Sequence, residues 1–133
     1  MRFPDSRATM KNIPLPGCHL RPVMFEPTSN KWSGQACAGF QIHVAERGAF
    51  MPYRTSLALL QAVMTLYKDD FRYKEPPYEY ECEKLPLDLI LGASSLRLAL
   101  ESGADLLELE NSWQAELVEY DQQRRKYFLY EQV

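Results

Sequence analysis

The sequence contains no long apolar run and no excess of basic residues. Its longest apolar runs, such as 57–60, are far shorter than the roughly 20 residues that a membrane-spanning helix needs. There are 15 Lys and Arg against 18 Asp and Glu, a net charge of −3, which does not favour a general nucleic-acid binder. We therefore expect no membrane span and no nucleic-acid partner. The 133 residues are 46% hydrophobic and 25% charged, which excludes intrinsic disorder.

Cysteine is scarce, and the spacing of the three cysteines fits neither a complete set of disulfides nor a zinc or redox motif. Cys18, Cys37 and Cys82 form no C-x-x-C pair, and an odd count excludes a complete disulfide framework. The spacing of Cys18 and Cys37 relative to His19 and His43 does not fit a zinc site. The G-x-S-x-G, P-loop and G-x-G-x-x-G motifs are also absent, which removes the commonest hydrolase and nucleotide-binding signatures. We expect neither a metal nor a cofactor.

Short segments with alternating apolar residues predict the strands of a small sheet. Residues 20–25 are rich in large apolar side chains, and Pro22 confines this strand to a sheet edge or a strand start. Apolar and polar residues alternate over 40–44, which predicts a strand with one buried face. Tyrosine and cysteine alternate with glutamate over 78–82, which predicts a further strand with an acidic, solvated outer face.

Helical periodicity dominates the rest of the chain, and all nine prolines fall at or before Pro86. Apolar residues three and four positions apart predict a helix over 55–68, which Thr55 or Ser56 could cap. A short turn or helix is expected over 87–91.

Two further helices are expected after Gly92. Ser94 is a candidate cap for the first, and Gly103 closes it in the position after its last turn. A capping box at Asp105 begins the second, whose apolar stripe continues to about residue 125. Residues 127–130 predict a terminal strand or a docking tail. The stripe comprises Leu106, Leu109, Trp113, Leu117 and Tyr120.

These elements predict one domain of the α+β class, a small, mainly antiparallel sheet with about three helices packed on it. Residues 1–12 are expected to be an irregular lead-in, and residues 13–133 the domain itself. The N-terminus has no apolar segment of the kind that a signal peptide requires.

The loop over 27–39 is the segment most typical of a ligand site. It is rich in glycine and serine and contains Lys31, Trp32 and Gln35. A loop tryptophan beside hydrogen-bonding side chains suits a sugar, because the C–H face of the sugar ring packs on the indole and its hydroxyls need polar partners. The alternative is that Trp32 folds back as a lid over the core.

Two polar side chains, Gln41 and His43, share one face of the strand predicted over 40–44. With Arg47 just beyond, they are candidates to line a cleft, or they form the solvated side of an antiparallel strand. His43 near Glu46 suggests acid–base chemistry only if a third group orients it.

Three segments together resemble a bacterial family. Residues 15–25 (LPGCHLRPVMF) resemble an LPGV-x-FRPV-x-F motif, residues 27–39 resemble a PT-x-SKY-x-GQ-x-C-x-G loop, and residues 40–47 resemble VQLHVTDR. These motifs are similar to the C-terminal domain of the NamZ-like exo-β-N-acetylmuramidases, with a weaker likeness continuing to residue 130.

The resemblance implies a function in bacterial cell-wall recycling. Members of this family are glycosidases that remove terminal N-acetylmuramic acid from peptidoglycan fragments, and their catalytic glutamate lies in a Rossmann-like N-terminal domain. The isolated chain is therefore expected to be inactive and to need that domain and a muropeptide as partners. The resemblance also implies a location in the cell envelope or outside the cell. The substrate-binding residues that it implies are Lys31, Trp32, Gln35, Gln41 and His43, with Arg47 and Arg54 as partners for the lactyl carboxylate.

Two other interpretations stay open. The chain is alternatively a freestanding module that binds amino sugars or cell-wall fragments, or a structural interaction domain whose sites have decayed.

Overall fold

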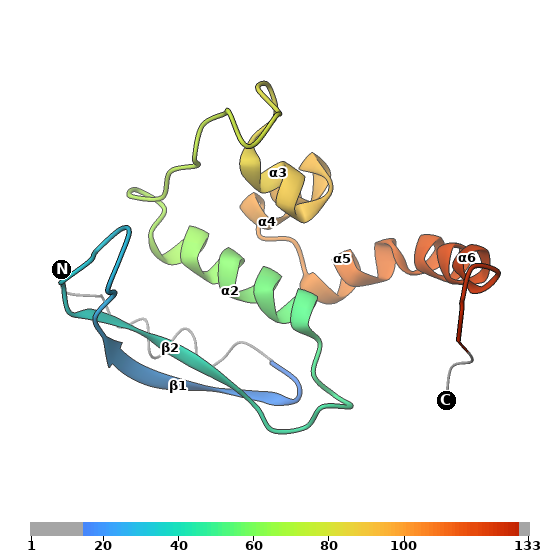
Figure 1. Ribbon diagram of the computed structural model, residues 1–133, viewed down its shortest axis with the longest axis horizontal. Helices are drawn as coiled ribbons and strands as arrows, with labels where there is room; N and C mark the ends of the chain where they lie inside the picture. The colour runs from blue at the N-terminus through green and yellow to red at the C-terminus, as the bar shows by residue number, and fades with distance from the viewer. Residues whose placement is uncertain (1–14, 131–133) are drawn as a thin grey trace. The chain divides into compact units, whose positions relative to one another are not determined.

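A computed structural model of the chain describes residues 15–130. The predicted α+β class, with a small antiparallel sheet, is confirmed. The chain divides into two compact units, residues 1–56 and 57–133. The lead-in predicted over 1–12 lies outside the described residues. In chain order, the elements are β1 (Cys18–Phe25), β2 (Cys37–Val44), α2 (Pro52–Leu66), α3 (Pro86–Leu91), α4 (Ser94–Glu101), α5 (Leu106–Ser112) and α6 (Gln114–Arg125) (Figure 1).

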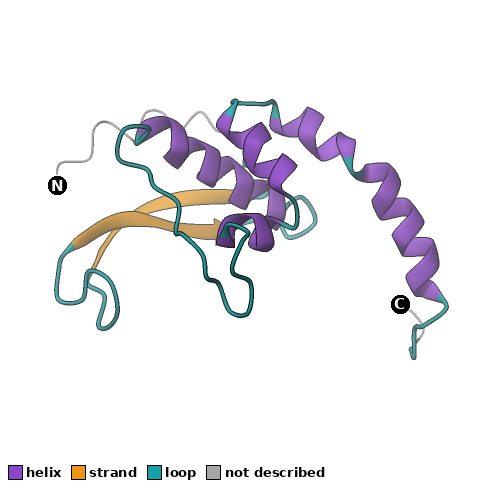
Figure 2. Cartoon of the chain, turned by 90° about the horizontal axis from the view of Figure 1, so that it is seen from above, coloured by secondary structure: helices purple, strands orange, loops and turns teal. Residues whose placement is uncertain are grey.

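Strands β1 and β2 form an antiparallel hairpin, in register from Cys18 opposite Val44 to Phe25 opposite Cys37. Both strands run further than the alternation predicted, and Figure 2 shows them side by side along their length. Each strand of a two-stranded sheet has a free edge. Pro22, which cannot donate a backbone hydrogen bond, is therefore tolerated within β1.

The two faces of the hairpin differ in polarity. One face is apolar and carries Leu20 and Phe40, while the other carries Arg21 and Gln41. The face predicted to be buried over 40–44 is only partly so, because its Ile42 and Val44 side chains are each more than two-fifths exposed.

Gly17 closes the open end of the hairpin. Its carbonyl oxygen accepts hydrogen bonds from the backbone N–H groups of Ala45 (2.9 Å) and Glu46 (3.1 Å). Its φ of 72° lies in the left-handed region, and a Cβ atom there would meet the backbone nitrogen of Phe50 at 2.5 Å. Only glycine fits this position without a shift of the backbone.

The helical unit, residues 57–133, has a hydrophobic core built on Leu57, Met64 and Leu100. Leu57 and Leu100 are each 1% exposed. Partly buried side chains that pack against this core are Leu60, Phe71, Tyr73, Leu87, Leu91, Leu106, Leu109 and Trp113.

Among the described residues, no helix is both long and apolar enough to cross a membrane.

Two of the predicted helix ends are confirmed. After α4, the Gly103 N–H bonds to the Leu100 carbonyl (3.1 Å) and the Ala104 N–H to the Ala99 carbonyl (3.0 Å), the pattern of a Schellman motif. At α5, the Asp105 carboxylate accepts the N–H groups of Leu107 and Glu108.

Other predicted caps are wrong. Helix α2 begins at Pro52, a residue suited to the first helical turn because its missing N–H would have no partner there. Ser56 is inside this helix and donates its hydroxyl to the Pro52 carbonyl (2.9 Å). Helix α4 is preceded by Ala93, which has no side chain able to cap it, so Ser94 is not its cap.

The continuous helix predicted over 105–125 is interrupted at Trp113, which ends α5 and precedes α6. Its φ of −105° and ψ of 1° are not helical, and the Ser112 hydroxyl just before it bonds to the Leu109 carbonyl. Trp113 packs against the core, whereas Leu117 on α6 is 50% exposed. The apolar stripe is therefore a core face only as far as Trp113.

The strand predicted over 78–82 is a tight turn. Tyr78 and Glu81 exchange backbone hydrogen bonds of 2.9 and 3.0 Å, and Glu79 between them has a φ of 53°. Tyr80 is fully exposed, so the alternation here buries no face. The Glu81 carboxylate accepts the N–H groups of Glu83 and Lys84, which lowers its pKa.

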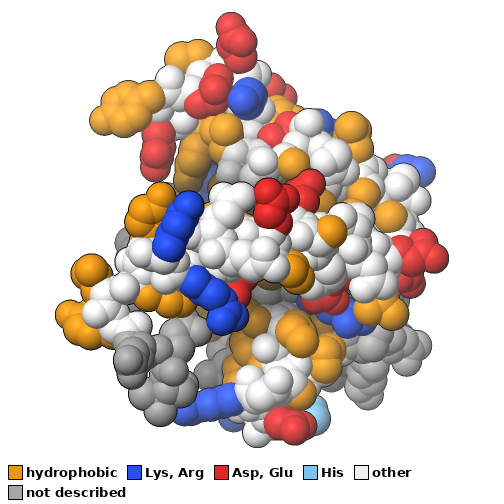
Figure 3. Space-filling model, turned by 90° about the vertical axis from the view of Figure 1, so that its right-hand side faces the viewer, with side chains coloured by type: hydrophobic (Ala, Val, Ile, Leu, Met, Phe, Trp, Pro, Cys, Tyr) orange, Lys and Arg blue, Asp and Glu red, His pale blue; other side chains and the backbone are white. Residues whose placement is uncertain are grey.

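The terminal strand predicted over 127–130 is also wrong. The Tyr127 and Phe128 N–H groups bond back to the Arg124 and Arg125 carbonyls, so this segment continues the turn of α6. Its side chains stay exposed, and Figure 3 shows hydrophobic side chains reaching the surface between charged ones on the face in view.

Candidate functional site

The loop that joins β1 to β2 presents Lys31, Trp32 and Gln35 to solvent. Backbone hydrogen bonds hold it, from the Gly34 N–H to the Pro27 carbonyl (3.0 Å) and from the Gln35 N–H to the Trp32 carbonyl (3.0 Å). The loop thus has a defined turn geometry that points its side chains outward.

Trp32 is exposed and has a left-handed backbone. Its side chain is 61% exposed, so it does not act as a lid over the core. Its φ is 62°, a conformation that costs a residue with a Cβ atom about 1 kcal/mol. Backbone strain of this kind occurs most often at active sites and ligand-binding sites. The exposed indole offers a flat apolar surface to a ligand ring.

Gln41 and His43 project from the polar face of β2, as the alternation predicts. The Gln41 Oε1 atom lies 3.2 Å from the His43 Nε2 atom. It also accepts a hydrogen bond of 2.7 Å from the Arg21 Nη2 atom on β1. His19, in register with His43, lies on the same face. The structure therefore brings four polar side chains together where the sequence analysis named two.

Arg21 and His19 were missed by the sequence analysis, although a signal for them exists. Both stand two residues apart in β1, as Gln41 and His43 do in β2. Once the two segments are paired as a hairpin, these alternating polar positions fall on one face.

The two predicted arginines lie beyond the hairpin. Arg47 is exposed in the turn after β2, where the Ala49 and Phe50 N–H groups bond to the Glu46 carbonyl. Arg54 is half-buried near the start of α2.

The predicted residues therefore form separate groups and not one cluster. Gln41 and His43 are paired with Arg21 and His19, near the open end of the hairpin. Lys31, Trp32 and Gln35 lie beyond its other end, roughly 13 Å or more along the strands from Gln41 at about 3.3 Å per residue. This arrangement is an open strip, whose two ends could contact different parts of an extended ligand.

The helical unit contains a separate polar network around Arg97. The Arg97 Nε atom lies 2.6 Å from the Asp88 Oδ1 atom, and its Nη1 atom lies 2.8 Å from the Glu101 Oε1 atom. The Tyr73 hydroxyl donates to Glu101, and the Arg97 guanidinium lies 5.5 Å from the centre of the Tyr73 ring. These contacts join α3, α4 and the segment before α3.

The ionisable groups of this network have shifted pKa values. Burial and the hydrogen bond to Glu101 raise the pKa of Tyr73 to about 12. The hydrogen bonds from Tyr73 and Arg97 lower the pKa of Glu101. The network is internally satisfied, which is typical of a structural role.

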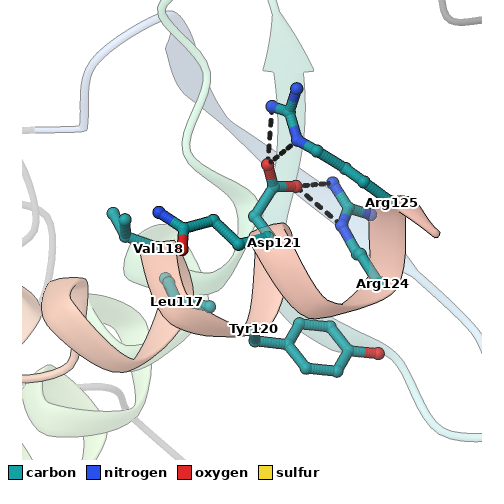
Figure 4. Close-up of a pocket in the computed structure, with 7 residues that line it drawn as sticks. Leu117, Val118, Tyr120, Asp121, Arg124 and Arg125 are labelled. Carbon is teal, nitrogen blue, oxygen red and sulfur yellow. Dashed lines mark hydrogen bonds and ion pairs between the residues drawn. The ribbon is translucent and has the colours of Figure 1, made fainter.

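Two hollows on the described surface of the helical unit can be compared with the predicted site. One follows α6, where the Asp121 carboxylate lies between the Arg124 and Arg125 guanidinium groups and Tyr120 points to the other side (Figure 4). The Asp121 carboxylate pairs with both guanidinium groups, so one net positive charge remains there. The other is bordered by the turn around Tyr80 and by α3. Neither hollow is lined by a predicted site residue. Within residues 15–130, no group of three or more His, Cys, Asp or Glu side chains is arranged to hold a metal ion.

Comparisons with known proteins agree on one family. The family described as "Exo-beta-N-acetylmuramidase NamZ, C-terminal" matches residues 3–130. The chain is 28% identical over 122 residues to the peptidoglycan beta-N-acetylmuramidase NamZ of Bacillus subtilis (strain 168), a match that covers 92% of this chain and 28% of that protein.

A solved structure shows the same fold. The crystal structure of a DUF1343 family protein from Bacteroides fragilis NCTC 9343 matches with a TM-score of 0.69 at 16% identity, over 98% of this chain and 33% of that chain. The chain thus spans a third or less of the length of these two relatives.

Proposed function

Because the chain belongs to the family of C-terminal domains of NamZ exo-β-N-acetylmuramidases, we propose that it walls one side of a cleft for peptidoglycan fragments that end in N-acetylmuramic acid. The family match over residues 3–130 carries this proposal. The other wall is a Rossmann-like N-terminal domain, such as the additional length of the Bacillus subtilis relative could contain.

The hairpin supplies the binding groups in this proposal. Trp32 stacks against a sugar ring, and Lys31 and Gln35 bind its hydroxyl or acetamido groups. Gln41 and His43 form hydrogen bonds with a second part of the ligand. The positive charges of Arg47 and Arg54 attract the lactyl carboxylate towards the hairpin unit, since a guanidinium can present two N–H donors to the two oxygens of a carboxylate.

The catalytic acid comes from the other domain in this proposal. Glycoside hydrolysis needs a carboxyl group that stays protonated near neutral pH, so its pKa must be raised. Among the described residues, the carboxyl groups with shifted pKa values are Glu81, Glu101 and Asp121, and all three shift downwards. Hydrogen bonds from neighbouring donors stabilise their charged forms, the opposite of what a proton donor needs.

An assay of glycosidase activity tests this division of labour. The isolated chain, mixed with a chromogenic N-acetylmuramic acid glycoside, should release no chromophore. The same chain joined to a family N-terminal domain should release it. Robust turnover by the isolated chain would overturn the proposal.

Binding measurements separate the proposal from a freestanding module. Calorimetric titration of the isolated chain with a disaccharide that ends in N-acetylmuramic acid should show weak binding that strengthens when the N-terminal domain is present. Equal affinity with and without that domain would favour the freestanding binding module instead.

A further inference from the structure

We propose that Arg21 is a positioning residue, which orients Gln41 and His43 so that this face of the hairpin binds a carboxylate. Arg21 lies on β1, outside the loop over 27–39 and the strand over 40–44 that contain most of the predicted binding residues. The inference deepens the proposed function, on which it rests only for the saccharide that would carry the carboxylate.

Arg21 sets the orientation of the Gln41 amide. A guanidinium has N–H donors and no acceptor, so the group that faces it must be the amide oxygen. The Arg21 Nη2 atom lies 2.7 Å from the Gln41 Oε1 atom. Arg21 therefore fixes which end of the amide is the oxygen and leaves the Gln41 NH₂ group to face outward as a donor.

The Gln41 oxygen in turn sets the position of a proton on the His43 ring. Its Nε2 atom lies 3.2 Å from the same Gln41 oxygen, which can only accept. Nε2 must then carry a hydrogen, in both the neutral and the charged ring. The order Arg21, Gln41, His43 is thus a chain in which the first member sets the orientation of the other two.

Within the described residues, Arg21 keeps a positive charge that no carboxylate neutralises. Its one hydrogen bond uses one of five N–H donors, and no carboxylate within residues 15–130 pairs with it. By contrast, Arg97, Arg124 and Arg125 each lie within 2.8 Å of an Asp or Glu oxygen. The remaining Arg21 donors and the Gln41 NH₂ group form a positively charged, donor-only surface, which suits a carboxylate.

Nuclear magnetic resonance of the full chain tests the positioning step without any ligand. In Arg21→Met, which keeps the apolar stem and removes the guanidinium, the side-chain ¹⁵N order parameter of Gln41 should fall to that of a freely rotating amide. The fraction of the His43 ring with hydrogen on Nε2 should fall with it. Arg21→Lys should restore part of the order, and Arg72→Met, another exposed arginine, should change neither signal. An unchanged Gln41 signal in Arg21→Met would overturn the proposal.

Titration with three probes tests the carboxylate. N-acetylmuramic acid and N-acetyl-D-alanine each carry a carboxylate. N-acetylglucosamine has the same sugar ring as N-acetylmuramic acid but lacks the lactyl group, and so has no carboxylate. We expect N-acetylmuramic acid to shift the Gln41 side-chain resonance, and the affinity to fall about tenfold in Arg21→Met.

The probes also separate this proposal from the proposed function. A shift with N-acetyl-D-alanine but not with N-acetylmuramic acid supports the carboxylate site and assigns it to a peptide end, which counts against a muramic acid ligand here. Binding of N-acetylglucosamine with the same affinity as N-acetylmuramic acid overturns the carboxylate site and leaves the sugar-binding function intact.

Discussion

The helical unit and the hairpin unit satisfy their side chains in opposite ways. In the helical unit, Leu57 and Leu100 are almost fully buried and the Arg97 guanidinium pairs with two carboxylates. In the hairpin unit, residues 1–56, Trp32 is largely exposed, and within the described residues Arg21 has one hydrogen bond, to the neutral amide of Gln41. If the hairpin unit binds the ligand as proposed, stability and recognition depend on different parts of the chain, and substitutions in each part should affect different measurements.

The largest effect should come from the helical core. Leu100→Ala should lower the free energy of unfolding by about 3 kcal/mol, because it leaves a cavity beside Leu57 and Met64. Urea unfolding followed by circular dichroism measures this loss. Leu117→Ala, at a half-exposed position on α6, is the matched control and should cost well under half as much. Equal losses would mean that α6 is covered in solution.

The hairpin should have one position of comparable sensitivity. Gly17→Ala should cost about 2 kcal/mol, since the added methyl group meets the backbone at Phe50 and Glu46 and the residue has a left-handed φ. The control is Gly48→Ala, where the added atom meets nothing within 4 Å. Thermal unfolding of Gly17→Ala and Gly48→Ala measures the difference in stability between them. If both alanines are tolerated alike, the closure of the hairpin does not depend on Gly17.

The Tyr73 network should make the helical unit sensitive to alkaline pH. The pKa of Tyr73 is raised to about 12 from its ordinary value of 10.0, so the folded state holds the proton more tightly than the unfolded state. This stabilisation is complete below pH 10 and is lost as pH rises towards 12. Tyr73→Phe should remove this part of the alkaline destabilisation, measured as unfolding free energy from pH 9 to 12. The control is Tyr80→Phe, at an exposed tyrosine, which should leave the pH dependence of the unfolding free energy unchanged. If Tyr80→Phe changes it as much as Tyr73→Phe does, the Tyr73 network is not the cause.

The smallest change in stability should accompany the loss of a binding group. Trp32→Gly removes the backbone strain of a tryptophan with a left-handed φ, which stabilises the folded state. It also raises the conformational entropy of the unfolded chain, which opposes folding. Because the two effects oppose each other, the unfolding free energy should change by no more than about 0.5 kcal/mol. Affinity for an N-acetylmuramic acid disaccharide should nevertheless fall at least tenfold by calorimetry. Trp32→Ala, which keeps the left-handed strain, should lose the same affinity. Undiminished binding in both variants would remove Trp32 from the site.

Local patterns predicted those elements whose stabilisation is itself local. The Asp105 cap and the Gly103 helix end depend on side chains and backbone groups within a few residues, and both are present as expected. The strand over 40–44 was likewise found, with its polar face on Gln41 and His43.

The errors arose where a pattern needed a partner that the sequence does not specify. The alternation over 78–82 indicates a strand only if another strand and a buried face are available, and Tyr80 has neither among the described residues. The stripe that continues to Tyr120 is a core face only where other side chains meet it, which ends at Trp113.

The candidate site was predicted in part for the same reason. The types of residue in the loop and in β2 pointed to a ligand, but the contact of Arg21 with Gln41 depends on the pairing of residues twenty positions apart. Such a contact follows from the hairpin register and not from the composition of either strand.

The interruption at Trp113 has a consequence for the order in which amide protons exchange with solvent. Helix α5 contributes Leu106 and Leu109 to the core, whereas α6 has no buried residue in the described part of the chain and its Asp121 pairs with Arg124 and Arg125. Short helices without tertiary support open readily in water. The amides of α6 should therefore exchange long before those of α2 and α4, and a protease should trim the chain from its C-terminus back to Trp113 and stop there.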